Sequence, residues 1–445
     1  MRKVPRTVGT NERDRESLRA RIRVAVDLAI GNSHVQAHHA LESVAPAAQS
    51  SGDEILALYF QARAIANIKA RRLDEGFAAF DLALQTARRY GEAALCARIL
   101  INYGTAAVQD GDVSLAIALL DEALTASRKI ERTTARNTLE KVRSLASTKP
   151  VALVSLSEAL YAAGQLERAA AVLHEFHTMR SGNTTDLITA ASVGIPLGML
   201  LADRALLRLS RDPNLIELAF SRREQWLCGP LAEAFCTYYE SVGRRGEHDA
   251  LLARALDSLT SLDNSLALGL RIARLGDAAS LPRVSALALR QCTGNSPLLD
   301  AYRDLFESFV GARRQTGERA RELARRAERR FARAGRPTMR ALALHAAGDS
   351  DAATALLRTC GAAQPASPRW LGAPVQRRLA AQLTPRESEV ARLAARGMTN
   401  RTIADALHLS ERTVHHHCEA IFGKLGIRSR WQISNALADV AQAAG

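Results

Sequence analysis

Aromatic side chains are scarce in this sequence, where they make up 4% of 445 residues. Valine, isoleucine and threonine never form long runs that alternate with polar residues, whereas alanine, leucine and arginine are abundant. Half-buried strands are built from such alternating runs. Their absence argues against a sheet protein and predicts an all-α fold.

The nucleotide-binding motif GxxxxGK[ST], whose backbone cradles phosphates, is also absent, and the only Gly-Lys pair is Gly423-Lys424. No paired-carboxylate or catalytic-triad pattern stands out, and no alternating β/α pattern with an acidic pocket suggests a receiver domain. We therefore expect a protein that is not an enzyme, has no cofactor and is not gated by a nucleotide.

The cysteines form no Cys-x-x-Cys pair, which argues against a disulfide framework and predicts reduced thiols. They are Cys96, Cys228, Cys236, Cys292, Cys360 and Cys418. The first 19 residues are charged without an apolar core, and the most apolar stretch, residues 193–201, is short and interrupted by Pro196. These features predict a cytoplasmic protein with neither a signal peptide nor a membrane span.

The chain is long enough for more than one domain and carries a net charge of +14, from 60 basic and 46 acidic residues. A basic balance of this kind suits a nucleic-acid partner, although it says nothing about fold.

Residues 1–360 form successive amphipathic patterns of repeat size. Residues 73–88 align without gaps with residues 113–128, at an offset of 40. A polar turn followed by a small-residue helix recurs after Gly111, Gly164 and Gly348. This pattern resembles degenerate tetratricopeptide (TPR) repeats and predicts a solenoid of helical hairpins that senses a signal, binds a partner or self-associates. An irregular helical bundle is the alternative.

A basic stretch covers residues 313–334, in which Glu318, Glu322 and Glu328 are interleaved with arginines at helical spacing. Two interpretations are open: a nucleic-acid-binding patch, or a solvated face of the last repeat whose charges pair within the helix. The second is favoured, since charge runs usually lie on solvated faces.

Residues 361–378 form a proline-rich linker, because Pro365, Pro368 and Pro374 prevent a helix from passing through. The linker separates the repeats from a C-terminal domain at residues 379–445. In that domain Thr384 and Glu387 match a capping box, and Gly397 ends the first helix.

Three further helices are expected in the C-terminal domain. The second runs from Thr399 to His408, the third starts at Ser410, and the fourth starts at Ser429. The tight turn between the second and third predicts a helix-turn-helix motif at about residues 400–419, with residues 410–422 as the recognition helix.

The third helix has two different faces. Val414, Cys418, Ile421 and Leu425 lie on an apolar stripe and should pack inward. The opposite side carries Arg412, His415, His416 and Glu419, while Thr413, His417 and Lys424 lie on a flank suited to phosphate contacts. Consecutive histidines project about 100° apart on a helix, so His415, His416 and His417 are not expected to share a metal ion.

Several segments of this domain resemble the LuxR/FixJ/NarL family of helix-turn-helix regulators. They are residues 383–390, 397–404, 409–414, His417 and 424–430. Together with the helical repeats, the arrangement is similar to the C-terminal part of the large MalT-like regulators. The resemblance implies base-reading positions at His415, His416 and Glu419, and dimerisation on DNA through residues 429–441. It implies backbone-contacting positions at Thr399, Asn400, Arg412, Thr413, Lys424 and Arg430.

The sequence therefore predicts a sequence-specific, DNA-binding transcription regulator associated with the nucleoid. The expected partners are double-stranded DNA, RNA polymerase, a second copy of the chain on DNA, and an unknown ligand or protein at the repeats. The two histidines and the glutamate depart from the basic or amide residues frequent at the family's base-reading positions. They keep a second hypothesis open, a protein-interaction scaffold with a degenerate helix-turn-helix domain. A sigma-factor-like promoter reader lacks a preceding aromatic-rich region.

Overall fold

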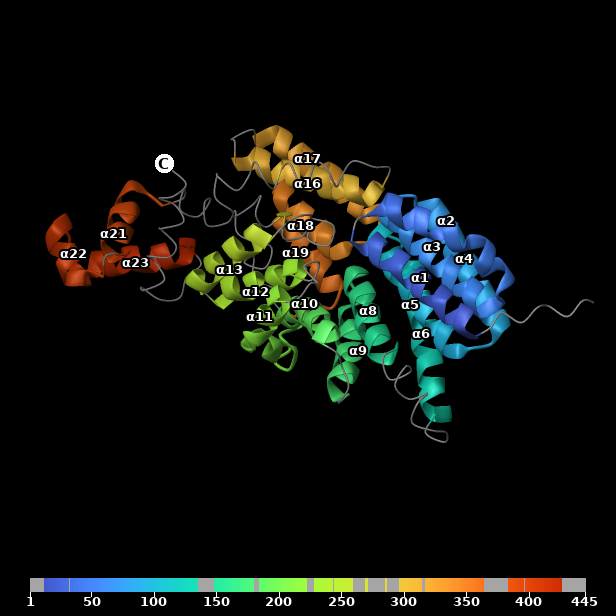
Figure 1. The fold of residues 1–445 in the computed structure, drawn as a ribbon. Helices are drawn as coiled ribbons and strands as arrows, with labels where there is room; N and C mark the ends of the chain where they lie inside the picture. Colours follow the sequence, from blue (N-terminus) through green and yellow to red (C-terminus); the bar gives the residue numbers. More distant parts are fainter. Residues whose placement is uncertain are drawn as a thin grey trace, which may run out of the picture. The chain divides into compact units, whose positions relative to one another are not determined.

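The structure is a computed structural model whose regular elements, throughout the part of the chain that it describes, are helices (Figure 1). The described residues are 12–31, 33–134, 148–179, 184–221, 228–242, 244–258, 269–270, 285, 296–313, 317–363, 383–395 and 397–425. The all-α prediction is confirmed for these residues. The chain divides into two compact units, Met1–Ala366 and Ser367–Gly445. This division falls inside the expected linker, and the exact domain boundaries stay a prediction.

The first unit begins with three helical hairpins. They are α1 (Glu12–Ile30) with α2 (His34–Ser50), α3 (Asp53–Lys69) with α4 (Leu73–Tyr90), and α5 (Ala93–Asp110) with α6 (Val113–Thr134). The offset of 40 read from the sequence is the distance between the first residues of α4 and α6, and also of α3 and α5. The chain therefore repeats a whole hairpin at this period.

Small residues set the geometry of these hairpins. Gly111 ends α5 with φ +105°, a left-handed conformation that favours glycine. Gly104 lies against α6, where a Cβ at this position would meet Leu120 Cγ at 2.6 Å. Ala116 is fully buried just after the turn. The two helices therefore pack closely because their contact positions carry little or no side chain.

The middle of the unit consists of α8 (Thr148–Ala162), α9 (Leu166–Thr178), α10 (Thr184–Leu201), the 3-10 helix η1 (Leu206–Arg211), α11 (Asn214–Ser221), α12 (Cys228–Val242) and α13 (Arg245–Ser258). Helix α10 is longer than the apolar stretch recognised in the sequence, and it is long and apolar enough to cross a membrane. More than half of it is buried inside the protein, where it packs against α8, α9, η1 and α12. Ile195 and Leu197 are fully buried. These contacts are those of a core helix.

The unit ends with α16 (Pro297–Arg313), α17 (Gly317–Arg333), α18 (Pro337–Ala347) and α19 (Ser350–Thr359). These helices contact much earlier parts of the chain. Arg336 donates from Nη2 to the Val108 carbonyl at the end of α5, and a Cβ on Gly164 would collide with Pro337 Cγ. Repeats of an open solenoid contact only their neighbours. Here the last hairpins also pack onto the turns of the α5–α6 and α8–α9 hairpins.

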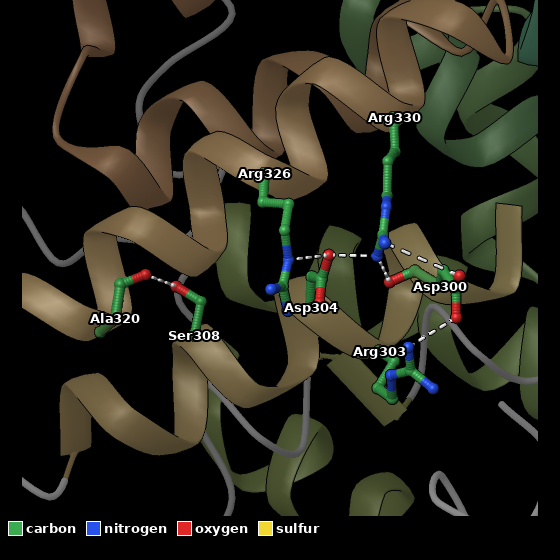
Figure 2. Close-up of polar contacts among 7 residues, drawn as sticks. All are labelled: Asp300, Arg303, Asp304, Ser308, Ala320, Arg326 and Arg330. Atoms are coloured by element: carbon green, nitrogen blue, oxygen red, sulfur yellow. Dashed lines mark hydrogen bonds and ion pairs between the residues drawn. The ribbon is translucent and has the colours of Figure 1, made fainter. Parts of the chain in front are cut away.

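Helix α17 contains most of the basic stretch, whose charges were expected to pair within the helix. Asp304 of α16 is 0% exposed and accepts hydrogen bonds from Arg326 and Arg330 of α17 (Figure 2). The distance from Arg326 Nε to Asp304 Oδ2 is 2.8 Å. Glu328 pairs with Arg340 of α18 at 2.7 Å rather than within its own helix. Pairing within the helix is therefore wrong for Arg326, Arg330 and Glu328, because their opposite charges lie on neighbouring helices.

The second unit contains α21 (Pro385–Ala395), α22 (Asn400–Leu407) and α23 (Glu411–Leu425). These are the first three helices predicted for the C-terminal domain. They share a core in which Val390, Ile403, Val414 and Ile421 are 0% exposed. The expected fourth helix at residues 429–441 and Arg430 lie outside the described residues.

Candidate nucleic-acid interface

Helix α21 is fixed at its start by the predicted capping box. The Thr384 N–H donates to Glu387 Oε2 at 2.6 Å, and the Glu387 N–H donates to Thr384 Oγ1 at 3.3 Å. Arg386 then donates from Nη2 to the carbonyl of Leu407, at the last residue of α22, with a distance of 2.6 Å. A cation at this position satisfies a free carbonyl and opposes the negative end of the helix dipole. Arg386 therefore fixes α22 relative to α21.

The connection between α22 and α23 is short. His408 adopts a left-handed conformation with φ 52°, and the Leu409 N–H donates to the Ala404 carbonyl at 2.9 Å. Ser410 caps α23, since its Oγ accepts from the Thr413 N–H at 3.0 Å. Three residues thus end one helix and start the next, which is the connection expected in a helix-turn-helix motif.

The inner face of α23 holds it against the rest of the domain. Val414 and Ile421 are 0% exposed and Cys418 is 3% exposed, as the apolar stripe predicted. The side chain of Leu425 lies outside the described part. The Cys418 thiol is 3.9 Å from Asn400 Oδ1, within reach of a weak hydrogen bond to the start of α22. This face therefore determines which side of α23 is turned outward.

The outer face of α23 carries the residues expected to read bases. The exposed fractions of the His415, His416 and Glu419 side chains are 62%, 71% and 58%. Glu419 Oε1 is 3.5 Å from His415 Nε2, and its Oε2 is 3.3 Å from His416 Nδ1. The three side chains form one cluster in which the carboxylate faces both imidazoles. A histidine can donate or accept a hydrogen bond, and a carboxylate can accept from the amino group of cytosine.

The described residues expected to contact the DNA backbone lie at the starts of α22 and α23. Thr399 caps α22 and accepts from the Thr402 N–H at 3.2 Å, and Arg412 is exposed in the first turn of α23. Thr413 and His417 are half-buried on the flank. The side chain of Lys424 lies outside the described part. Their roles in DNA binding stay predictions.

Two positioning contacts were not predicted from the sequence, that of Arg386 with Leu407 and that of Cys418 with Asn400. Each joins residues on different helices, and no spacing rule connects them. Among the described residues, no group of three or more histidine, cysteine or acidic side chains is arranged to hold a metal ion.

Two helices joined by a tight turn, the second with a buried apolar face and an exposed polar face, define a helix-turn-helix module. Residues 381–436 match the family described as bacterial regulatory proteins, luxR family. The C-terminal domain is a luxR-family helix-turn-helix domain, as its sequence motifs predicted.

Similar proteins carry names of the same kind. The chain is 48% identical over 48 residues to the transcriptional regulatory protein ComA of Bacillus subtilis (strain 168), which is 11% of this chain and 22% of that protein. It is 45% identical over 51 residues to the putative HTH-type transcriptional regulator Mb0914c of Mycobacterium bovis (strain ATCC BAA-935 / AF2122/97), covering 12% of this chain and 6% of that protein. The chain thus matches less than a quarter of either relative's length.

Proposed function

We propose that this protein is a cytoplasmic transcription regulator that binds double-stranded DNA sequence-specifically and has no enzymatic activity. The observation that carries the proposal is the two-sided character of α23. Its inner side is anchored by Val414, Cys418 and Ile421, and its outer side exposes His415, His416 and Glu419 directly after a tight turn. Helices of this kind place polar side chains against base edges in the major groove.

Affinity and choice of site come from different residues in this proposal. Thr399, Asn400, Arg412 and Thr413 lie at or near the starts of α22 and α23, where helix N-termini favour phosphate groups. Lys424 and Arg430 would contact the backbone further along, as the family resemblance implies. These contacts hold the domain on the duplex and make binding salt-dependent.

Site selection belongs to the His415–His416–Glu419 cluster. Since Glu419 accepts but cannot donate, it selects for the amino group of cytosine at the position that it faces. A carboxylate also repels nearby phosphates, so the cluster favours specificity over affinity. A second copy of the chain, paired through residues 429–441, would present the same cluster to a half-site related by two-fold symmetry. The helical repeats would bind a ligand or partner, and the regulator would act on RNA polymerase.

The experiment measures binding of the full chain to genomic fragments across a salt titration. Arg412→Gln should weaken binding to all fragments alike and reduce the magnitude of the slope of log K against log salt concentration by about 1. His415→Ala should reduce the preference for the selected site over random DNA by about 5- to 150-fold, which corresponds to ~1–3 kcal/mol. Arg392→Gln, an exposed position of α21 outside the cluster, is the matched control and should change neither. Failure of the full chain to retard any genomic fragment at low salt would refute the proposal.

A protein-interaction scaffold is the second candidate, favoured by the acidic residue at the centre of the base-reading face. Thr413→Ala combined with Lys424→Glu separates the two. Unchanged regulation in the cell would support the scaffold, and lost regulation would support the DNA-binding regulator.

A further inference from the structure

The outer surface of α17 carries more arginines than the acidic side chains around it can neutralise. Ala324 and Phe331 are buried on the inner side, and Arg326 and Arg330 are turned toward Asp304 of α16. The remaining arginines are exposed and form no ion pair with any described residue. They are Arg319, Arg321, Arg325, Arg329 and Arg333.

The acidic side chains near this surface leave an excess of positive charge. Glu328 pairs with Arg340, and the carboxylates of Asp300 and Asp304 pair with arginines at the interface between α16 and α17 (Figure 2). Glu318 and Glu322 are the two exposed acidic residues of α17. Five exposed arginines against these two glutamates leave three positive charges on one helix surface.

Four of these arginines, Arg321, Arg325, Arg329 and Arg333, lie in a row with a spacing of four residues, so neighbours along the row are separated by about 6 Å of helix axis. We call the first three of them, Arg321, Arg325 and Arg329, the arginine stripe. The stripe is about 12 Å long, from the rise of an α-helix. A DNA duplex of the same length carries roughly seven phosphates, since it has one negative charge per about 1.7 Å of its axis.

We propose that the arginine stripe of α17 is a second nucleic-acid-binding surface, which contacts the phosphate backbone of duplex DNA without reading its sequence. The guanidinium group suits this partner because it offers a planar fork of donors to phosphate oxygens and never loses its charge. A solvated surface with mixed charges would be the ordinary alternative. Here Asp300, Asp304 and Glu328 pair at helix contacts instead, and the exposed Glu318 and Glu322 of α17 are outnumbered by the five exposed arginines.

The proposal predicts a specific salt dependence. Three arginines that each neutralise one phosphate contribute about −2.7 to the slope of log K against log salt concentration. Between 50 and 200 mM salt this contribution alone weakens binding about 40-fold, by the same relation. Because the stripe does not read bases, its contribution is the same for random and selected sequences.

The test uses the full chain with a short random-sequence duplex, and follows fluorescence anisotropy across a sodium chloride titration. Arg321→Gln/Arg325→Gln/Arg329→Gln should reduce the magnitude of the slope by about 2.7. A matched control removes the same charge from scattered exposed positions, with Arg63→Gln/Arg98→Gln/Arg358→Gln. It should leave the slope unchanged. Circular dichroism melting should agree among all three proteins, because the replaced side chains are exposed.

Equal slopes for the stripe variant and the control would overturn the proposal. It would also be overturned if the stripe variant bound the duplex as the wild type does and lost binding to phosphatidylserine vesicles instead. The result is independent of the regulator function. If the wild-type chain prefers no genomic fragment but its binding to random duplex depends on the stripe, the proposed site-specific function fails and the stripe stands. If site preference is lost in His415→Ala while the stripe variant keeps its slope, the stripe fails and the regulator stands.

Discussion

Replacing Asp304 with asparagine removes the buried carboxylate that joins α16 to α17. This carboxylate is 0% exposed and accepts from Arg326 Nε, Arg326 Nη2 and Arg330 Nη1. The exposed fractions of the two arginine side chains are 48% and 28%. Once released, both guanidinium groups can therefore reach water, whereas the carboxylate cannot.

Because the arginines are partly exposed and the carboxylate is buried, replacing one or the other should lower the free energy of unfolding by different amounts. Asp304→Asn loses hydrogen bonds between charged groups but leaves arginines that water can solvate, so we expect a loss of about 2–3 kcal/mol in the free energy of unfolding. Arg326→Gln/Arg330→Gln leaves a buried carboxylate without its cationic partners, and the loss should reach about 3–5 kcal/mol. The double replacement at the partly exposed positions is thus predicted to cost more than the single replacement at the buried one.

The assay is urea unfolding of the full chain followed by far-ultraviolet circular dichroism. Arg88→Gln is a suitable control, because it breaks an ion pair with Glu122 whose side chains are 55% and 50% exposed. Pairs at such exposure contribute about 0–1 kcal/mol. If Asp304→Asn costs no more than Arg88→Gln, or if the arginine double variant is the more stable of the two, the buried carboxylate is not what holds α16 to α17.

Three further predictions concern other parts of the molecule. Ile421→Ala removes a fully buried side chain from α23 and should destabilise the C-terminal domain by about 2–5 kcal/mol, so that DNA binding is lost while the melting of the repeat unit is unchanged. Thr384→Ala removes one half of the capping box and should cost about 1 kcal/mol, measured as a lower urea midpoint, with Thr384→Ser as the variant that restores it. Burial and nearby Arg72 lower the pKa of His38, opposed by Glu42 and Glu75, so the unfolded chain takes up this proton more readily than the folded one. The free energy of unfolding should therefore fall as the pH decreases below about 6.5. Between pH 8 and pH 5, urea titration should show a smaller fall for His38→Gln than for the wild type. An equal fall in both proteins would show that His38 is not the group responsible.

The C-terminal site was largely predictable, because its geometry depends on residues close together in the sequence. The capping box joins Thr384 to Glu387, and Ser410 caps α23 by accepting from the N–H of Thr413, three positions later. The apolar spacing of Val414, Cys418 and Ile421 then sets which face of the helix is buried. Such contacts form within one or two helical turns, so the spacing of residue types is sufficient to predict them.

What the sequence by itself determined is the helical content, the 40-residue hairpin period and the exposed polar face of α23. Only the tertiary structure decided which charges meet. Arg336 reaches the carbonyl of Val108, which is 228 residues away, and Asp304 selects Arg326 and Arg330 from a helix with several other arginines. These partners depend on how one helix packs against another, and no local spacing encodes that arrangement. Because burial rather than proximity in the chain selects each pair, the unpaired surface of α17 also emerged only from the folded molecule.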